Sequence, residues 1–416
     1  MHKRFLLLAT AAIPSLAWAQ RPTCAPDNAG LTLPAGFCAV LVGENLGPVR
    51  HLAVAPNGDL FAAKRGAQGG IVALRDTTGD GKADVVSNFL QGVGGSGIAL
   101  SADAVYFAAN GNANNNTKAS VLRFSWKPGE LIPSGAPDTI ATDLPIGGHG
   151  EKGIALGRND ALFVSFGSLT NSCLPPGIDR QIAQAGPNPC TELEQRAGIW
   201  RFDAKKTGQT PATGTRWATG LRNAMAVSVD PATGTLYAGV HGRDGLAEQW
   251  KWPAEEGREN PAETVYALAE GADGGWPYCY FDSRQKVMVL NPEYGGDGTK
   301  AGDCGRKTQP VASFPGHWAP NATAFSQGTQ FPAAFRDGIF VAFHGSWNRA
   351  PAPQEGYRVV FAPVKNGKGT GAPVNFAVPA GDPTSIRFTG LAFGPDGSLY
   401  LSADLQGKIW RVMYRQ

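Results

Sequence analysis

Six times along the chain a polar turn is followed by a short run of apolar and aromatic residues, and this repeat limits the fold more than any other feature. The copies are PNGDLFAA (56–63), SADAVYFAA (101–109), RNDALFVSF (158–166), PATGTLYAGV (231–240), FRDGIFVAF (335–343) and PDGSLYLSA (395–403). A small apolar run, such as HLAVA (51–55) or GLAFG (390–394), precedes each copy, and a third apolar run often follows it. This order predicts a strand, a tight turn, a strand, a longer loop and a further strand in each unit.

Six such units predict an all-β fold, a six-bladed β-propeller in which residues 20–416 form one domain. The runs of small residues should form the innermost strands, because space near the axis is limited. The early run FCAVLVG (37–43) should join the last blade and close the ring. Long insertions are expected around 165–195 and 241–320, and we find no helical period of useful length. A β-sandwich and a seven-bladed propeller are the alternatives.

Composition and the first residues indicate an exported globular chain. Hydrophobic residues make up 42% and charged residues 17%, and the 55 glycines favour many tight turns. A net charge of +3, without a run of Lys or Arg, gives no reason to expect a nucleic-acid partner. Residues 1–19 have a basic start, an apolar centre and Ala17-Trp18-Ala19 before Gln20, as in a secretory signal peptide. We expect a periplasmic or secreted location and no membrane span.

The six cysteines lie in three pairs of near neighbours along the chain. In an exported protein an even number predicts disulfides, and proximity favours Cys24–Cys38, Cys173–Cys190 and Cys279–Cys304. Six cysteines permit 15 connectivities, so the other pairings stay open. The sequence has no CxxC pair that would favour zinc, and no CxxCH motif for covalent haem.

Pseudo-symmetry predicts where the polar residues of the repeats gather. Residues just before an innermost strand and residues just after a second strand should lie at the same end of a propeller, here called the mouth. The first set includes Arg50, His51, Ser96, His149, Glu151, Lys152, Arg222, Asn223, His317 and Arg387. The second set includes Arg65, Ser168, His241, Arg243, His344, Asn348, Arg349 and Asp404.

Taken singly, each of these residues is explained by a loop hydrogen bond or a solvated strand end. Together, arginines, histidines and asparagines from separate blades predict a mouth that binds a planar or carboxylated ligand. Trp318 and Trp347 could supply stacking faces. The stretch HGSWNR (344–349) would then be one wall of a ligand site.

Several of these segments resemble one enzyme family. They are GGHGEKGIALGRNDALFVSFGS, GLRNAMAVSVDPATGTLYAGVHGRD, GGWPYCY, FPGHWAP, HGSWNR with the following GYRVV, and GPDGSLYLSADLQGKIWRV. The chain is similar to the soluble PQQ-dependent sugar dehydrogenases, and most similar to the sorbosone-dehydrogenase and pyranose-dehydrogenase branch. The resemblance covers nearly all of the chain after residue 19.

The resemblance implies a six-bladed propeller with pyrroloquinoline quinone (PQQ) on its axis, held by calcium, that oxidises a sugar or sugar aldehyde at C1. It implies that His149 is the general base and that Arg222 lies beside the reduced carbonyls of the cofactor. Backbone carbonyls of Gly242 and Arg243 would hold the calcium. The predicted cofactor contacts are Arg50, Asn223, His317, His344, Asn348, Arg349 and Arg387. Electrons would pass to an external acceptor, a cytochrome or the quinone pool.

The chain differs from the glucose-oxidising relatives at two positions of this pattern. Gly148 stands where they have an aspartate, and Thr389 stands where they have a second arginine near Arg387. Two other functions stay open. One is a calcium-dependent lactonase, which needs a metal ringed by Asn, Asp and Glu. The other is a non-catalytic propeller that binds a glycan or a protein.

Overall fold

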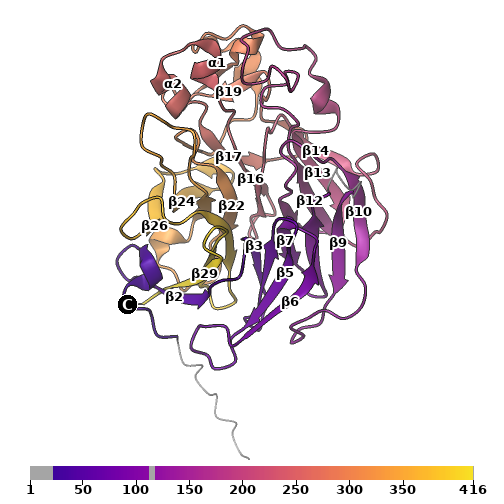
Figure 1. Cartoon of the computed structure of the whole chain (residues 1–416), viewed down its shortest axis with the longest axis vertical. Helices are drawn as coiled ribbons and strands as arrows, with labels where there is room; N and C mark the ends of the chain where they lie inside the picture. Colours follow the sequence, from indigo (N-terminus) through magenta and orange to yellow (C-terminus); the bar gives the residue numbers. More distant parts are fainter. Residues whose placement is uncertain (1–21, 112–117, 416) are drawn as a thin grey trace, which may run out of the picture.

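The computed structural model describes residues 22–111 and 118–415. Its strands form six antiparallel sheets around one axis, and the predicted six-bladed β-propeller is confirmed (Figure 1). Each sheet contains four strands that run from the axis to the outer rim. Innermost strands contact one another around the ring, in the order β3, β7, β11, β15, β22 and β27.

The innermost and second strands correspond to the repeated runs of the sequence. The innermost strands are β3 (Val49–Val54), β7 (Gly95–Leu100), β11 (Ile154–Leu156), β15 (Ala226–Val229), β22 (Pro320–Phe325) and β27 (Phe388–Phe393). The second strands are β4 (Leu60–Lys64), β8 (Ala104–Ala109), β12 (Ala161–Phe166), β16 (Leu236–Val240), β23 (Gly338–Phe343) and β28 (Leu399–Ala403).

The third and outermost strands complete the blades. The third strands are β5 (Gly70–Arg75), β9 (Ala119–Ser125), β13 (Gly198–Asp203), β17 (Glu263–Leu268), β24 (Arg358–Lys365) and β29 (Lys408–Tyr414). The outermost strands are β6 (Val85–Gln91), β10 (Asp138–Leu144), β14 (Thr215–Thr219), β21 (Ala312–Phe314), β26 (Val374–Pro379) and β2 (Phe37–Gly43). Strand β2 pairs with β29, so the early run 37–43 closes the ring as predicted.

Small residues on the innermost strands are required by close backbone approach. A Cβ atom at Gly153 would lie 2.2 Å from the carbonyl oxygen of Met225, at the start of the next blade. A Cβ atom at Gly390 would lie equally close to the carbonyl oxygen of Arg50. Neighbouring innermost strands therefore meet backbone to backbone, and a side chain at these positions would push the blades apart.

The hydrophobic core lies between blades. Phe61 of β4 packs with Phe107 of β8, and Phe340 of β23 packs with Leu401 of β28, each within one buried cluster. Both faces of a middle strand are covered by neighbouring blades, which explains why these strands are nearly continuous apolar runs. Burial of each such large side chain stabilises the fold by roughly 1.5–3 kcal/mol.

The long insertions differ from the prediction in one respect. The stretch 241–320 is not a single insertion, because β17 and β21 within it belong to the fourth blade. The parts outside the blade contain α1 (Leu246–Trp250), α2 (Ala254–Glu259) and the hairpin of β19 (Cys279–Phe281) and β20 (Met288–Leu290). Helices α1 and α2 and strand β19 lie together beyond one end of the blades, at the top of Figure 1.

Short elements account for the remaining regular structure. The additional strands are β1 (Leu31–Thr32), β18 (Ala272–Asp273) and β25 (Lys368–Gly369). The short 3₁₀ turns are η1 (Asn28–Gly30), η3 (Thr191–Glu194), η4 (Pro292–Tyr294), η5 (Gly302–Arg306) and η6 (Ala333–Phe335). In the part of the chain described, no helix combines the length and apolar character needed to span a bilayer.

All three predicted disulfides are present: Cys24–Cys38, Cys173–Cys190 and Cys279–Cys304. The first ties the segment before the propeller to β2. The other two lie in the excursions beyond the blade ends. The predicted signal peptide, residues 1–19, lies outside the described residues.

Candidate active site

The mouth is the end of the propeller where innermost strands begin and second strands end. The structure places the predicted polar residues there because all six blades share one strand direction. They fall into two groups, each centred on an aspartate. We call them the Asp244 cluster (Asp244, Arg222, Arg180, His317 and Asn348) and the Asp404 cluster (Asp404, Arg50, Arg65, His344 and Arg387).

His149 has a fixed tautomer. Its Nδ1 lies 3.0 Å from the carbonyl oxygen of Ser168 and 3.0 Å from the Ser168 hydroxyl oxygen. That hydroxyl donates its own hydrogen to the Thr170 carbonyl at 2.6 Å, so both Ser168 oxygens act as acceptors. Nδ1 must therefore carry the proton, which leaves the lone pair of the imidazole on Nε2.

His149 is also held neutral. Burial, and next the positive charge of Arg222, lower its pKa to about 2. The backbone beside it leaves little freedom, because a Cβ at Gly167 would lie 2.5 Å from the His149 Cβ. Gly148 has φ +57°, and a Cβ there would lie 2.4 Å from the Leu169 carbonyl oxygen. An aspartate therefore cannot replace Gly148 without moving this loop.

Two cations hold the loop that carries His149. The Lys152 ammonium donates to the carbonyls of Pro145 and Gly150, at 2.7 and 2.5 Å. Arg196 donates to the carbonyls of Ile146 and Gly147. Lys152 was predicted to line the mouth; instead it is fully buried, and burial, with Arg196 as a further cause, lowers its pKa to about 7. These bonds fix the position of His149 from both sides.

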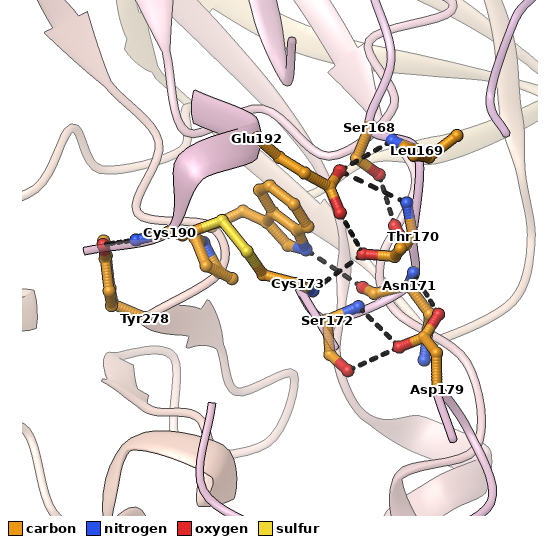
Figure 2. Close-up of a disulfide and its surroundings, with 12 residues drawn as sticks. Ser168, Leu169, Thr170, Asn171, Ser172, Cys173, Asp179, Cys190, Glu192 and Tyr278 are labelled. Atoms are coloured by element: carbon orange, nitrogen blue, oxygen red, sulfur yellow. Dashed lines mark hydrogen bonds between the residues drawn. A yellow bond between two sulfur atoms is a disulfide. The ribbon is translucent and has the colours of Figure 1, made fainter. Parts of the chain in front are cut away.

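The wall behind Ser168 is supported by the Cys173–Cys190 disulfide (Figure 2). The Glu192 carboxylate, two residues after Cys190, accepts the backbone N–H groups of Leu169 and Thr170. Asp179 accepts the N–H groups of Asn171 and Ser172 on the other side of the segment. The segment 168–172 is therefore held rigidly.

The Asp244 cluster joins three blades and the disulfide loop. The Asp244 carboxylate contacts Arg222 at 3.1 Å, Arg180 at 2.9 Å and the Nδ1 of His317 at 3.5 Å. It also accepts from the side-chain amide of Asn348 at 3.1 Å. Arg222 is buried, and it donates further to the Asn171 side chain and to the Gly242 carbonyl. One carboxylate therefore positions residues that are more than a hundred positions apart in sequence.

His317 in this cluster is a double donor. Its Nε2 lies 2.6 Å from the Gly257 carbonyl and its Nδ1 faces Asp244, so both neighbours are acceptors. Burial alone would lower the pKa of His317, but the hydrogen bonds to Asp244 and Gly257 raise it above its ordinary value. Burial also opposes the ionisation of Asp244, yet His317 and Arg222 hold its carboxyl pKa far below the usual range.

The Asp404 cluster has a similar composition and joins residues of the first, fifth and sixth blades. Asp404 contacts Arg50 at 3.0 Å, His344 Nε2 at 3.0 Å and, more distantly, Arg65 at 3.8 Å. The guanidinium of Arg387 lies 3.3 Å from the Nδ1 of His344. Arginine cannot accept, so Nδ1 accepts and Nε2 carries the proton. Burial lowers the pKa of His344, and this histidine is neutral.

The loop 344–349 joins the two clusters. His344 belongs to the Asp404 cluster and Asn348 to the Asp244 cluster. Arg387 donates to the carbonyls of Gly345 and Ser346, and the Tyr357 hydroxyl donates to the Ser346 carbonyl at 2.6 Å. The polar residues of HGSWNR are therefore what connects the blades around the mouth.

Other predicted residues have different surroundings. Arg349 is buried and turned toward α2, where it donates to the Arg258 and Gly316 carbonyls and pairs with Glu259 at 3.0 Å. Its guanidinium thus anchors the 344–349 loop to the insertion. Asn223 is half-buried beside Arg222, and its backbone carbonyl accepts from His241.

Position 389 has a structural role. The Thr389 hydroxyl is fully buried and donates to the Val49 carbonyl at 3.0 Å, which ties the sixth blade to the first. As a threonine, position 389 supplies no cation to this wall.

The proposed calcium ligands, the backbone carbonyls of Gly242 and Arg243, stay a prediction. The Gly242 carbonyl accepts from Arg222 at 2.7 Å, and the Arg243 side chain is buried in a pair with Glu293. Calcium prefers six to eight oxygen ligands. Among the described residues, no three or more His, Cys, Asp or Glu side chains converge as metal ligands.

The charges of the mouth fit a ligand with several carboxylates. Cations outnumber carboxylates in the two clusters, and the buried Arg50 Nε finds no hydrogen-bond partner among the described residues. The cations are Arg50, Arg65, Arg180, Arg222, Arg387 and His317; the carboxylates are Asp244, Asp404 and the nearby Glu151. Guanidinium groups bind carboxylates in pairs of hydrogen bonds.

Sequence reasoning placed Asp404 and Ser168 at the mouth without a role, and it gave no role to Asp244. Arg196 and Asn171 were not singled out at all. Their roles depend on contacts with other blades, which no local pattern reveals. The repeat did provide a signal for Asp404, because it follows a second strand as His344 does.

One cavity lies away from the mouth, and a smaller one borders it. One of about 1120 Å³ opens at the opposite end, between turns that carry Asp59, Asp76 and Asp396. The other, of about 40 Å³, lies behind Arg222 and His241. The smaller cavity has room for a water molecule but not for a cofactor.

Comparison with known proteins gives one family match. A family model described as TrAA12-like matches residues 31–415. A pyrroloquinoline quinone-dependent pyranose dehydrogenase from Coprinopsis cinerea is 27% identical over a 229-residue alignment that covers 46% of this chain and 30% of that relative. The chain therefore spans less than a third of the length of this relative.

Solved structures share the same architecture. The holo form of the pyranose dehydrogenase PQQ domain from Coprinopsis cinerea is 19% identical with a TM-score of 0.72, covering 94% of this chain and 98% of that one. A calcium structure of a Trichoderma reesei protein of Carbohydrate-Active Enzymes Family AA12 is 19% identical with a TM-score of 0.74, covering 92% and 97%. At this identity the likeness shows the fold.

Proposed function

The chain belongs to the TrAA12-like family, and from that premise we propose that it is an oxidoreductase that oxidises a sugar or sugar aldehyde at C1 with PQQ. The proposal rests on the lone pair of His149 Nε2. The imidazole of His149 is held neutral, and it lies beside the buried guanidinium of Arg222. The Coprinopsis cinerea relative that supports it is described as PQQ-dependent and as a pyranose dehydrogenase.

PQQ supplies, when bound, an acceptor for the hydride together with three carboxylates. Arg50 and Arg387 would hold carboxylates of the cofactor, with the ring of His344 beside them. Both nitrogens of His344 are engaged with Asp404 and Arg387, so we propose that it contacts the cofactor through its face. Asn223, His317 and Asn348 complete the proposed contacts, and Arg349 supports them by anchoring their loop.

In the reaction His149 would take the hydroxyl proton at Nε2 while the hydride leaves C1. A pKa of about 2 is low for this task; burial is the largest cause of that value and the charge of Arg222 is the next. An anionic ligand beside Arg222 would offset its charge and bring His149 closer to a useful basicity. Arg222, oriented by Asp244, would stabilise negative charge that develops on the acceptor.

We further propose export to an oxidising compartment, periplasmic or extracellular, because three disulfides are stable there. An external acceptor, a cytochrome or the quinone pool, would reoxidise the cofactor. Calcium stays in the proposal as a prediction from the resemblance and from the calcium structure of the Trichoderma reesei neighbour. No step above depends on it.

The test is to add PQQ to the purified chain, with calcium or with EDTA, and then to add an aldose or sugar aldehyde. We expect cofactor absorbance that bleaches with the sugar. His149→Ala should keep cofactor affinity and lower kcat by about 10²–10⁴. A calcium-dependent site would lose cofactor affinity in EDTA.

His51→Gln serves as the control, because His51 is a buried histidine whose Nε2 contacts the Asn321 carbonyl at 2.7 Å. The glutamine amide keeps a donor there, and turnover should stay within a few-fold of the wild type. Equal turnover in His149→Ala and the wild type would remove His149 from the reaction. Lactone hydrolysis without cofactor, or glycan binding without turnover, would favour the two alternatives instead.

A further inference from the structure

Three loops at the mouth share an arrangement that the proposed reaction does not use. In each, a buried polar residue is followed directly by an exposed large apolar residue. The pairs are Ser168 and Leu169, Ser346 and Trp347, and Asp404 and Leu405. Each pair follows the second strand of its blade, so pseudo-symmetry places all three at the same end. We call Leu169, Trp347 and Leu405 the apolar rim.

The rim is unusually exposed. Trp347 is 68% exposed and Leu405 65% exposed, more than any other large apolar side chain of the described residues. Burying such a side chain would stabilise the fold, so a chain gains nothing in stability by exposing it. Exposed aromatic residues beside a concave polar site are typical of ligand recognition.

Trp347 is exposed on a rigid support. The residue before it, Ser346, is fully buried, and its hydroxyl oxygen accepts from the Glu355 N–H at 2.9 Å while the hydroxyl donates to Gln354 at 2.7 Å. The residue after it, Asn348, donates to Asp244. The indole is therefore carried between the Asp244 and Asp404 clusters on a loop with little freedom, and a ligand that stacks on it pays little conformational entropy.

We propose that the apolar rim is a carbohydrate subsite, in which Trp347 stacks on a sugar ring beyond the one that is oxidised, so that the substrate class includes oligosaccharides. This inference rests on the proposed function for the position of the reacting ring. His149 and Trp347 lie on loops of the third and the fifth blade, so we assign them to separate rings of one substrate. Sugar rings have apolar C–H faces and polar edges, which match apolar side chains set singly among polar loops.

Binding to the cofactor-free chain tests this directly. Cellotriose, maltotriose and xylotriose, with glucose and xylose, are titrated by calorimetry and by tryptophan fluorescence. At least one trisaccharide should bind more tightly than its monosaccharide. Trp347→Ala should weaken that trisaccharide about tenfold and leave the monosaccharide unchanged. Trp347→Phe should keep most of the affinity, and Leu405→Ala should reduce it less than Trp347→Ala.

Ile132→Ala is the matched control, because Ile132 is 46% exposed on a loop between the third and outermost strands, at the opposite end. It should bind every sugar as the wild type does. Equal affinity for monosaccharides and trisaccharides, or equal losses for both in Trp347→Ala, overturns the subsite. A Trp347→Ala enzyme whose only change is a higher KM for a quinone or cytochrome acceptor also overturns the subsite.

The result separates the two proposals. A chain that binds a trisaccharide through Trp347 but never bleaches PQQ keeps the subsite and refutes the dehydrogenase. A chain that oxidises monosaccharides and trisaccharides with the same kcat/KM in wild type and Trp347→Ala keeps the dehydrogenase and refutes the subsite.

Discussion

The Asp244 and Asp404 clusters each combine aspartate, arginine and histidine, but their histidines differ in charge. Each aspartate binds an arginine and a histidine at 3.0–3.5 Å. His317 in the first cluster has a raised pKa, whereas His344 in the second has a lowered pKa. The aspartate is common to both, so it cannot be the cause of the difference.

The difference comes from the other neighbours: Glu263 raises the pKa of His317, Arg50 lowers the pKa of His344, and the group at the second ring nitrogen acts in the same direction on each. His317 faces the Gly257 carbonyl, an acceptor, and must donate from both nitrogens. His344 faces the Arg387 guanidinium, a donor, and must accept there. A hydrogen bond to the charged form raises a histidine pKa, and a nearby cation lowers it. The mouth therefore has one side where the imidazole is cationic and one side where the imidazole is neutral.

The largest effect is expected from Asp244→Asn. Arg222 is 4% exposed in its side chain and would lose its carboxylate partner. Breaking such a pair should lower the free energy of unfolding by about 3 kcal/mol, measured by urea denaturation. The pKa of His317 should fall, which NMR titration would follow. An unchanged His317 pKa would show that Gly257 alone sets its charge.

Asp404→Asn is the matched variant for that comparison. It should also destabilise the fold, because Arg50 and Asp404 are both almost fully buried. His344 is already neutral, however, so its protonation state near neutral pH should not change. A variant that altered the proton uptake of the protein between pH 6 and 8 would contradict this assignment of the tautomer.

Arg387→Met tests the second cluster with a smaller effect. Methionine keeps much of the volume, while the cation at His344 Nδ1 is removed. Asp404 and Arg50 remain as charged neighbours, but with the nearer cation at Nδ1 gone the pKa of His344 should rise, as measured by NMR titration. PQQ affinity should fall in the same variant. A pKa that stays low would mean that burial outweighs Arg387.

The smallest effect is the pH dependence of stability. The folded pKa of His317 exceeds 6.5, so its contribution is present below about pH 6.5 and is lost as the pH rises through the folded value. His51 and His241 have the opposite sign: burial lowers both pKa values to about 4, so their contribution is lost as the pH falls below about 6.5. Chemical denaturation of His317→Gln is measured from pH 5 to 9. The free energy of unfolding of this variant should lack the fall on the alkaline side and keep the fall on the acidic side.

Much of the fold could be predicted because the repeat is local. Turn and strand signals recur six times, and they placed the innermost strands and the closing strand β2 correctly. The third strand of the fourth blade, β17, was missed because it begins with Glu263 inside a long excursion. The two short helices have too few residues for a period to appear.

The sequence predicted where the site residues lie, but not their burial, their orientation or their hydrogen-bond partners. Register brought His149, Arg222 and His344 to one end, yet it could not show that Lys152 is buried or that Arg349 turns toward α2. Those outcomes depend on which carbonyls and carboxylates the neighbouring blades supply. A residue type and its place in a repeat carry no information about such partners.

The sequence by itself determined the number of blades, the cysteine pairs that lie close in the chain, and the end at which the polar residues gather. Periodicity is enough for these, because they follow from strand direction and short separations. Only the tertiary structure decided which histidine is charged, which nitrogen has the lone pair and which arginine is free to meet a ligand. Those properties are set by desolvation and by hydrogen-bond partners far away in sequence, such as Asp404 for Arg50 and Ser168 for His149.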